Sequence, residues 1–342
     1  MNDSIRDPSP ELTPLAPSAA AVPPESAVDC DALRTQLATL AGEGILIGTS
    51  SWKYPGWVGS LYTRERYMYR GKFAESRFER DCLAEYASVF HTVCVDAAYY
   101  TFPSEKYLAG LAAQVPDTFQ FTFKVTDEIT IRHFPRLPRF GPRAGTDNEC
   151  FLNAPMFIDR FLGPMETIRN KVGVFLFEFS RFYPSDFARG RDFIAALDEF
   201  LGELPKTWRY GVEIRNKNFL QPEYFACLAR HGVSHVFNSW EAMPSLADQL
   251  QLPDNMPASF IAARLLLRPG RDYEDAVKAF SPYDRIRDSY PEGRAAAVQL
   301  MREALKRGRK PALVYVNNRF EGYALATISR LVEELERSRG KP

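Results

Sequence analysis

The chain has 342 residues, of which 45% are hydrophobic and 25% are charged, an ordinary composition for a folded globular protein. Its 43 basic and 43 acidic side chains balance, so the composition excludes a global field that would steer the protein to nucleic acid or to a membrane. No apolar run approaches the ~20 residues of a membrane span and no signal pattern opens the chain, so we expect a cytoplasmic protein without membrane contact.

Residues 1–28 are predicted to be a disordered tail. The segment is rich in Pro, Ala and Ser, with prolines at positions 8, 10, 14, 17, 23 and 24. Such a composition does not bury enough apolar surface to offset the entropy that is lost on ordering. A short helix is expected over Asp31–Leu40, within a barrel domain that we expect to span residues 29–342.

From Ile45 onward, runs that are typical of strands alternate with amphipathic, helical runs. The predicted strands are Ile45–Ser50, His91–Ala98, Phe119–Val125, Val172–Phe179, Arg209–Arg215, Ser234–Ser239, Ser259–Leu267 and Ala312–Asn318. The predicted helices are Phe73–Phe90, Ser104–Gln114, Asn153–Ile168, Ser185–Leu201, Pro222–Arg230, a short one near Leu246, Tyr273–Phe280, Gly293–Arg307 and Tyr323–Arg337. Eight repeated βα units predict an α/β fold, a single (β/α)8 TIM-type barrel. A doubly wound open sheet is the alternative fold, but this sequence has no Gly-rich dinucleotide-binding turn after the first strand.

Alternation along the predicted strands indicates which side chains face the barrel interior. Phe121 and Phe123 share one face of their strand, and Lys124 lies on the other. Glu213 and Arg215 likewise share a face, opposite two aliphatic residues. Because successive strand side chains point to opposite faces, we expect the apolar set under the helices and the polar set inside.

Polar side chains gather late in the predicted strands, at the end where barrel enzymes hold their catalytic groups. The predicted catalytic residues are Glu213, Lys124 and Asp96. The predicted substrate-binding residues are Arg215, Arg264, Ser50, Trp52, Tyr54, Tyr100, Asn238, Asn317 and Asn318. Glu213 is the expected general acid or base with Asp96 as its charge-tuning partner, and the cations are expected to hold a phosphate or carboxylate. Trp52 and Tyr54 are expected to form a wall against which a ring packs.

The same residues admit a structural interpretation. Glu213 and Arg215 are suited to form an ion pair that closes the barrel, and Asp96 with Lys124 a second one. The aromatic residues around Trp52 would then be a packed plug without a ligand. Convergence of several such groups from different strands favours a functional site over this alternative.

The sequence assigns no metal and no cofactor. No HxH, HExxH or Cys/His cluster is recognised, so a histidine-rich zinc site is not expected. An oxygen-ligand Mg²⁺ or Mn²⁺ site from Asp96, Glu178 and Glu213 is an alternative, which the neighbouring Lys124 and Arg215 oppose. The five cysteines share no CxxC spacing, which indicates reduced thiols.

Two long connections, Arg132–Glu149 and Arg268–Gly293, are expected to shape the site. The first is rich in arginine, which makes a nucleic-acid or protein partner an alternative for that loop. His133 lies in it and is interpreted as a surface residue rather than an acid–base group. The remaining histidines are expected to be structural, namely His91, His231 and His235.

Six short motifs follow one another along the chain. They are Gly48-Thr49-Ser50-Ser51-Trp52 with Tyr54 and Trp57, Thr92-Val93 through Tyr99-Tyr100 and Pro103, Phe123-Lys124 with Ile129-Thr130, Val212-Glu213-Ile214-Arg215, Arg264, and Val316-Asn317-Asn318 with Gly322. In this order they resemble the domain of unknown function 72 family, the YecE-like proteins, over about residues 45–335. The resemblance implies a β/α barrel and a site at its mouth, but it implies no reaction.

The chain departs from the family pattern at several of these positions. The family usually has Glu and Asn where this chain has Cys94 and Asp96, and Gln where it has Glu178. His133 is displaced from Thr130, whereas the family has the two together. The resemblance therefore implies a divergent member with altered specificity or lost activity.

Two functional hypotheses follow from the sequence. The first is an enzyme of the hydrolase or lyase/isomerase type that acts on a small anionic or sugar-like substrate at the carboxyl ends of the strands. The alternative is a non-catalytic barrel that binds a small ligand or nucleic acid. The substrate, the reaction and the oligomeric state are not determined by the sequence.

Overall fold

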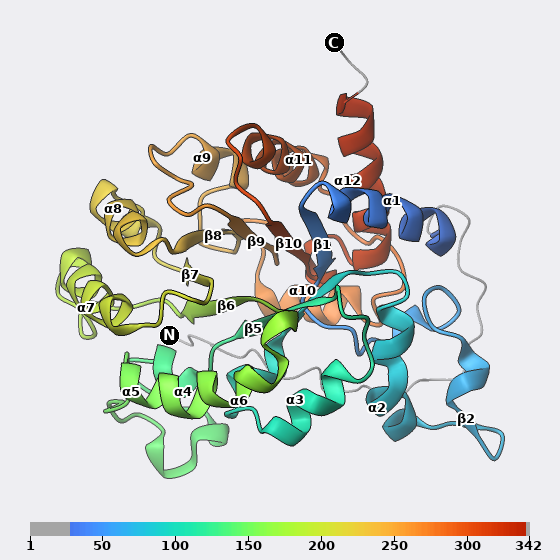
Figure 1. The fold of residues 1–342 in the computed structure, drawn as a ribbon, viewed down its shortest axis with the longest axis horizontal. Coiled ribbons are helices and arrows are strands. Elements are labelled where there is room, and N and C mark those ends of the chain that lie inside the picture. Colours follow the sequence, from blue (N-terminus) through green and yellow to red (C-terminus); the bar gives the residue numbers. More distant parts are fainter. Residues whose placement is uncertain (1–27, 340–342) are drawn as a thin grey trace.

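The structure is a computed structural model that describes residues 28–339 (Figure 1). Residues 1–27, nearly all of the predicted disordered tail, lie outside the described part. The tail and the boundary of the barrel domain at residue 29 therefore stay predictions. None of the helices in residues 28–339 combines the length and the apolarity that crossing a bilayer requires.

Eight parallel strands close into a barrel in the order β1-β10-β9-β8-β7-β6-β5-β4. Their bounds are β1 Ile45–Thr49, β4 Thr92–Val95, β5 Gln120–Lys124, β6 Val172–Phe179, β7 Tyr210–Ile214, β8 Ser234–Ser239, β9 Ile261–Leu265 and β10 Ala312–Val316. Strand β1 pairs with both β10 and β4, which closes the ring. The predicted TIM-type barrel is confirmed. A short antiparallel hairpin, β2 (Met68–Tyr69) with β3 (Lys72–Phe73), was not predicted.

Helices surround the strands in Figure 1. The longer ones are α1 Cys30–Gly42, α2 Glu75–Tyr86, α3 Glu105–Ala112, α7 Gly190–Glu203, α8 Pro222–His231, α10 Tyr273–Phe280, α11 Pro291–Lys306 and α12 Ala324–Arg339. The short ones are α4 Asp127–Thr130, α5 Ala154–Met156, α6 Gly163–Met165 and α9 Leu246–Leu250. Side-chain caps fix several starts, since Asp29 accepts from two backbone amides of α1 and Ser104 accepts from one of α3.

The predicted continuous helix over Asn153–Ile168 is wrong in detail. The segment runs as α5, a π-helical turn over Phe157–Leu162, α6 and a 3-10 turn over Glu166–Lys171. Pro164 lies inside this stretch and has no backbone N–H to donate to the preceding turn, so a regular α-helix is interrupted there.

The outward face of the barrel wall carries the apolar residues that alternation predicts, whereas the interior is charged only toward the carboxyl ends of the strands and is mostly apolar below them. The outward set, which includes Phe121, Phe123 and Val212, packs in the main core together with residues of the helices. A separate apolar cluster fills the interior: Cys94, Val174, Leu176, Val236, Ala258, Phe260, Ala262, Leu313 and Tyr315. The charged residues follow these along the same strands, so they lie above an apolar floor, at the carboxyl ends. We call this end of the barrel the mouth.

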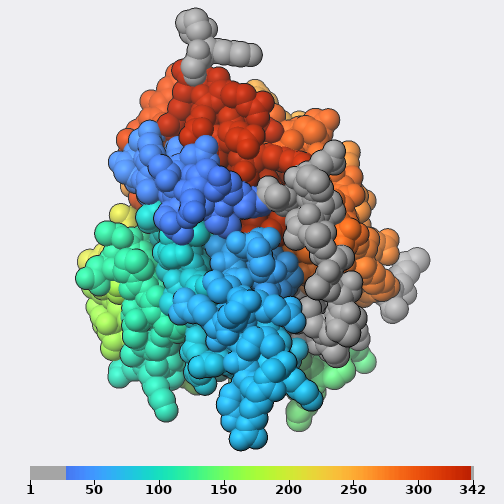
Figure 2. Space-filling model, turned by 90° about the vertical axis from the view of Figure 1, so that its right-hand side faces the viewer, coloured from blue at the N-terminus to red at the C-terminus, as the bar shows by residue number. Residues whose placement is uncertain are grey.

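The two ends of the described chain meet on the outside of the barrel. Helix α1 lies beside α12, as the blue and red regions of Figure 2 show. The Gln36 side-chain amide donates to Glu336 over 3.0 Å, and Arg339 pairs with Glu43 at 2.6 Å. These contacts are exposed and contribute little stability each, so the apolar stripes of the two helices hold this junction.

Gly48 in β1 is predicted to be irreplaceable for steric reasons. A Cβ atom there would lie 2.2 Å from the backbone oxygen of Thr92, which β1 and β4 hold in place. We expect Gly48→Ala to lower the free energy of unfolding by about 3 kcal/mol or more, because the backbone has to move. Gly42→Ala is the matched control, since a Cβ at Gly42 meets nothing within 4 Å. Urea unfolding measures both, and equal stabilities of the two variants would contradict the packing described here.

Candidate functional site

Six charged side chains meet at the mouth, and we call them the charge network. They are Asp96, Lys124, Glu178, Glu213, Arg215 and Arg264. Asp96 directly follows β4, Lys124 ends β5, and Arg215 directly follows β7. Glu178 on β6 and Glu213 on β7 are partners in the strand register, so their side chains start side by side. All three predicted catalytic residues and two of the predicted binding residues are thus in contact through one network.

Arg264 on β9 reaches across the barrel to three carboxylates. One guanidinium nitrogen donates to Glu213 at 2.9 Å and also to Glu178. The other terminal nitrogen donates to Asp96 at 3.3 Å. The three carboxylates come from three different strands, and Arg264 is only 2% exposed. A single buried cation therefore ties together strands that are far apart in the sequence.

Glu178 is the acceptor on which the cations converge. Its carboxylate lies 3.1 Å from the Lys124 ammonium and 3.1 Å from Arg215, and it also accepts from Arg264. Burial opposes the charge of this carboxylate, but Lys124, Arg215 and Arg264 outweigh it and hold the pKa of Glu178 far below its usual range. The three cations therefore favour the ionised form of Glu178.

The charge network is balanced and almost closed to solvent. Three cations face three carboxylates, and Glu213, Lys124 and Arg264 are 0%, 1% and 2% exposed. Asp96 differs, since 28% of its side chain is exposed. Buried charges persist only when they are paired in this way. Asp96 is thus the most exposed carboxylate of the network.

Aromatic rings support two of the cations. The Lys124 ammonium lies 3.7 Å from the centre of the Tyr99 ring, and the Arg215 guanidinium lies 3.9 Å from that of Trp240. Such cation–π contacts stabilise a buried cation by roughly 0.5 to 2 kcal/mol. Trp240 is a site residue that the sequence reasoning missed. It directly follows β8, two positions after Asn238, so a strand period continued by one residue would have placed both on the same face.

The predicted aromatic wall is packed into the protein. Trp52 and Tyr54 are 4% and 9% exposed and belong to the main core. The Tyr54 ring lies 4.7 Å from that of Trp57, centre to centre. Tyr100 is half-buried, with its ring 5.3 Å from that of Tyr99. This packing matches the plug alternative for Tyr54, whereas Tyr100 lies beside the ring that carries Lys124.

The three asparagines that were expected to bind substrate make hydrogen bonds to the protein backbone. Asn317 accepts from the backbone amide of Arg319 at 2.9 Å, and Asn318 accepts from that of Ala324 at 2.8 Å. Asn238 is completely buried, and its amide nitrogen donates weakly to two backbone carbonyls. These residues therefore shape the backbone at the mouth and also present polar atoms to it.

Several buried polar atoms at the mouth have no hydrogen-bond partner among the described residues. They are Ser50 Oγ, Trp52 Nε1, Arg215 Nε, Asn238 Oδ1, Arg264 Nε and Asn318 Nδ2. A buried unpartnered polar atom destabilises a fold by about 1–3 kcal/mol, so native proteins have few of them. These six are among fourteen such atoms in the described residues, and all six belong to residues at the carboxyl ends of the strands, which supports a site there that binds a polar molecule.

The three carboxylates considered for Mg²⁺ or Mn²⁺ surround a protein cation instead. Asp96, Glu178 and Glu213 all contact the guanidinium of Arg264. Hard divalent cations are held by oxygen ligands that converge on one point. Here Arg264 supplies the positive charge at that point, so these residues do not fit a divalent ion.

The loop over residues 132–149 packs on the outer side of the Tyr99 ring. Arg139 pairs with Asp127 at 2.9 Å and lies 5.6 Å from the Tyr99 ring centre. Arg143 pairs with Glu128 at 2.5 Å. These ion pairs neutralise two of the arginines on which the nucleic-acid hypothesis rests. His133 is exposed and lies 2.9 Å from Asp147 at the surface.

His235 is a packing residue, as expected. It is buried, contacts the Tyr224 hydroxyl at 3.1 Å, and has a pKa lowered by burial to about 4, so it is neutral.

The expectation that cysteine and histidine do not cluster is wrong for the described residues. Cys227 and His231 of α8 lie next to Asp198 of α7. Their i, i+4 spacing is the sequence signal that was available.

A closed ring of eight parallel strands with a buried charge network at the carboxyl ends defines a β/α barrel protein with a polar site at its mouth. The family model described as "Protein of unknown function DUF72" matches residues 46–342, and the chain belongs to this family. A curated relative is the UPF0759 protein YecE of Escherichia coli K12, which is 25% identical over 186 residues. That alignment covers 53% of this chain and half of the relative.

Solved structures of the same family share the fold. A DUF72 family protein (EF0366) of Enterococcus faecalis V583 has a TM-score of 0.57 and 19% identity, over 85% of this chain and 95% of that one. A DUF72 family protein (TM1631) of Thermotoga maritima MSB8 also has a TM-score of 0.57 and 19% identity, over 86% and 99%. At this identity the likeness supports the barrel and no particular reaction.

Removal of the central carboxylate is expected to be strongly destabilising. Glu178→Gln leaves three cations facing two carboxylates in a buried site, and we expect it to lower the free energy of unfolding at pH 7 by about 3 kcal/mol. The pKa of Glu178 is lowered by folding, so its stabilising effect is present above the unfolded pKa of about 4.3 and is lost as the pH falls below it. The difference between wild type and variant should therefore shrink in acid.

Urea unfolding at pH 7 and at several acidic pH values measures this effect. Glu149→Gln is the control, since Glu149 is exposed in the loop. A Glu178→Gln variant that matches the control at pH 7 would show that the charge network contributes no net stability.

Proposed function

We propose that the protein is an enzyme that transfers a proton to or from a small, uncharged, sugar-like substrate at the mouth of the barrel. The buried polar atoms without partners carry this proposal. Trp52, Arg215, Arg264 and Asn318 contribute donors, Asn238 contributes an acceptor, and the Ser50 hydroxyl can act as either. A polyol suits this set, because each hydroxyl both donates and accepts.

The balance of the charge network favours a neutral substrate over an anionic one. Lys124, Arg215 and Arg264 were predicted to hold a phosphate or carboxylate, but each of them already contacts a carboxylate of the protein. An added anion would leave an uncompensated negative charge in a buried site, which is costly. A neutral sugar adds no charge and leaves the ion pairs in place.

Asp96 is the proton-transfer group in this proposal. Its side chain is the partly exposed carboxylate of the network, and Arg264 contacts it at 3.3 Å. Glu213 is completely buried and contacts Arg215 at 2.7 Å, so we assign it the task of positioning the arginines. Lys124 and Arg264 supply fixed positive charge that stabilises an oxyanion on the substrate.

Of the two reaction types, the geometry favours the lyase/isomerase type. Hydrolysis of a glycoside by two carboxyl groups needs one of them protonated at neutral pH. Glu178 has a lowered pKa and contacts three cations, and Glu213 contacts two. Proton transfer by one carboxylate next to fixed cations needs no protonated partner.

Deuterium exchange tests the proposal. The protein is incubated in D2O with D-xylose, D-xylulose, D-glucose and D-fructose, and in parallel with glucose 6-phosphate and fructose 6-phosphate. We expect NMR to show exchange of a carbon-bound proton in a neutral sugar. Asp96→Asn should slow this exchange roughly 10²- to 10⁴-fold, as for loss of a general base. The exposed Asp159→Asn serves as the control and should leave the rate unchanged.

A Glu213→Gln variant separates the two carboxylates. It should weaken sugar binding, measured by saturation-transfer NMR, more than it slows exchange at saturating sugar. Loss of exchange in a folded Glu213→Gln protein, together with full exchange in Asp96→Asn, would make Glu213 the base instead. Binding and exchange confined to the sugar phosphates would contradict the preference for a neutral substrate.

A further inference from the structure

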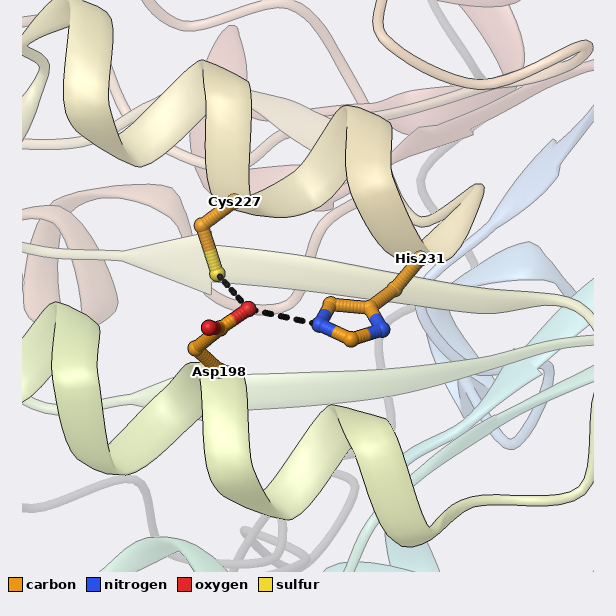
Figure 3. Close-up of side chains that lie close together, drawn as sticks. All are labelled: Asp198, Cys227 and His231. Atoms are coloured by element: carbon orange, nitrogen blue, oxygen red, sulfur yellow. Dashed lines mark hydrogen bonds and ion pairs between the residues drawn. The ribbon is translucent and has the colours of Figure 1, made fainter.

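A second group of reactive side chains lies outside the barrel, between two neighbouring helices. Asp198 projects from α7, and Cys227 and His231 project from α8 toward it (Figure 3). None of the three belongs to the charge network. The proposal that follows therefore does not depend on the function assigned to the mouth.

The three side chains offer one ligand atom each within a small volume. The Cys227 sulfur donates to Asp198 Oδ1 over 3.7 Å, and His231 Nε2 lies 2.6 Å from the same oxygen. All three ligand atoms lie within 4.8 Å of one another. Cys227 and His231 are four residues apart on α8, so both face the same side of that helix.

We propose that Asp198, Cys227 and His231 form a binding site for one Zn²⁺ ion. Thiolate sulfur, imidazole nitrogen and carboxylate oxygen are the three ligand types that zinc takes in proteins. The mixed set with a thiolate excludes Mg²⁺ and Ca²⁺, which prefer oxygen alone. Three protein ligands leave the fourth tetrahedral position to a water molecule. On binding, the thiol proton of Cys227 leaves to solvent and a Zn–S bond forms.

The oxygen–sulfur and oxygen–nitrogen spacings come within about 1 Å of those around a tetrahedral ion. Bonds of ~2.0 Å to oxygen and nitrogen and ~2.3 Å to sulfur give edges of about 3.3 Å between oxygen and nitrogen and about 3.5 Å between oxygen and sulfur. The oxygen–sulfur distance of 3.7 Å already matches. The oxygen–nitrogen distance of 2.6 Å has to open by less than 1 Å, which a small rotation of the half-buried Asp198 provides.

Two exposed cations, Arg230 and Lys206, lie next to the proposed ion and oppose it electrostatically. Arg230 pairs with Asp198 through Oδ2, the oxygen that zinc does not use. Lys206 Nζ lies 3.3 Å from His231 Nδ1 and also donates to the carbonyl of Leu201 at 2.7 Å. Both cations are exposed, so Lys206 can withdraw from His231 at little cost and leave Nδ1 protonated when Nε2 binds the metal.

Cobalt(II) spectroscopy of the full chain tests the site. Co²⁺ substitutes for Zn²⁺, and tetrahedral thiolate coordination produces a sulfur-to-cobalt charge-transfer band and strong visible d–d bands. We expect one Co²⁺ per chain with both features, and stoichiometric displacement by Zn²⁺. Cys227→Ser should abolish the charge-transfer band, whereas Cys150→Ser, which alters a half-buried cysteine on a loop, should retain it.

Lys206→Ala provides a test that does not depend on the buried cysteine. Removing this exposed positive charge next to His231 should tighten Zn²⁺ binding about two- to fivefold, measured by competition with a chromogenic chelator. Lys278→Ala, at an exposed lysine of α10, should leave the affinity unchanged. The proposal is overturned if wild type shows no thiolate band, if the band persists in Cys227→Ser, or if Lys206→Ala binds no more tightly than wild type.

Discussion

The contact of Arg264 with three carboxylates is the constraint on which the mouth of the barrel depends. Burial of six charges is favourable only if each one meets its opposite, and the barrel achieves this by drawing them from β4, β5, β6, β7 and β9. Arg264 is central because its planar guanidinium offers several donors in fixed directions, which a lysine does not. Glu178 plays the matching role among the acids, since it contacts all three cations.

The barrel interior is divided along its axis. Apolar side chains and Tyr315 fill the end that lies under the charge network, and the Tyr315 hydroxyl is 2.8 Å from Thr92 Oγ1. This floor excludes water from below, so the ion pairs above it act in a medium of low polarity and are strong. Polar atoms without partners then lie at the boundary between the packed floor and the mouth, and these are the atoms that the proposed sugar substrate would satisfy.

Two of the positions at which the sequence departs from the family pattern, Asp96 and Glu178, belong to this network, whereas Cys94 belongs to the apolar floor. Where the resemblance implies a Glu and an Asn, this chain has Cys94 and Asp96, whose side chains are 3.5 Å apart. This chain thus has an acid in the same region, but the acid is two residues farther along the chain and therefore nearer the mouth. Glu178, where the family usually has Gln, adds the charge that lets three cations be buried. Asp96 and Glu178 both contact Arg264, so the two positions act in one set of ion pairs.

The sequence by itself determined the order of the barrel strands, the closed barrel and, for several strands, the face that packs under the helices, because hydrophobic periodicity is a local property. It also identified Asp96, Lys124, Glu213, Arg215 and Arg264 as neighbours at one end. The partners of each charge were decided only by tertiary structure, since Arg264 meets residues 51, 86 and 168 positions away. Which of these residues come into contact depends on how the strands of the closed barrel are staggered relative to one another. The approach of Asp198 to Cys227 and His231 depends in the same way on how α7 packs against α8.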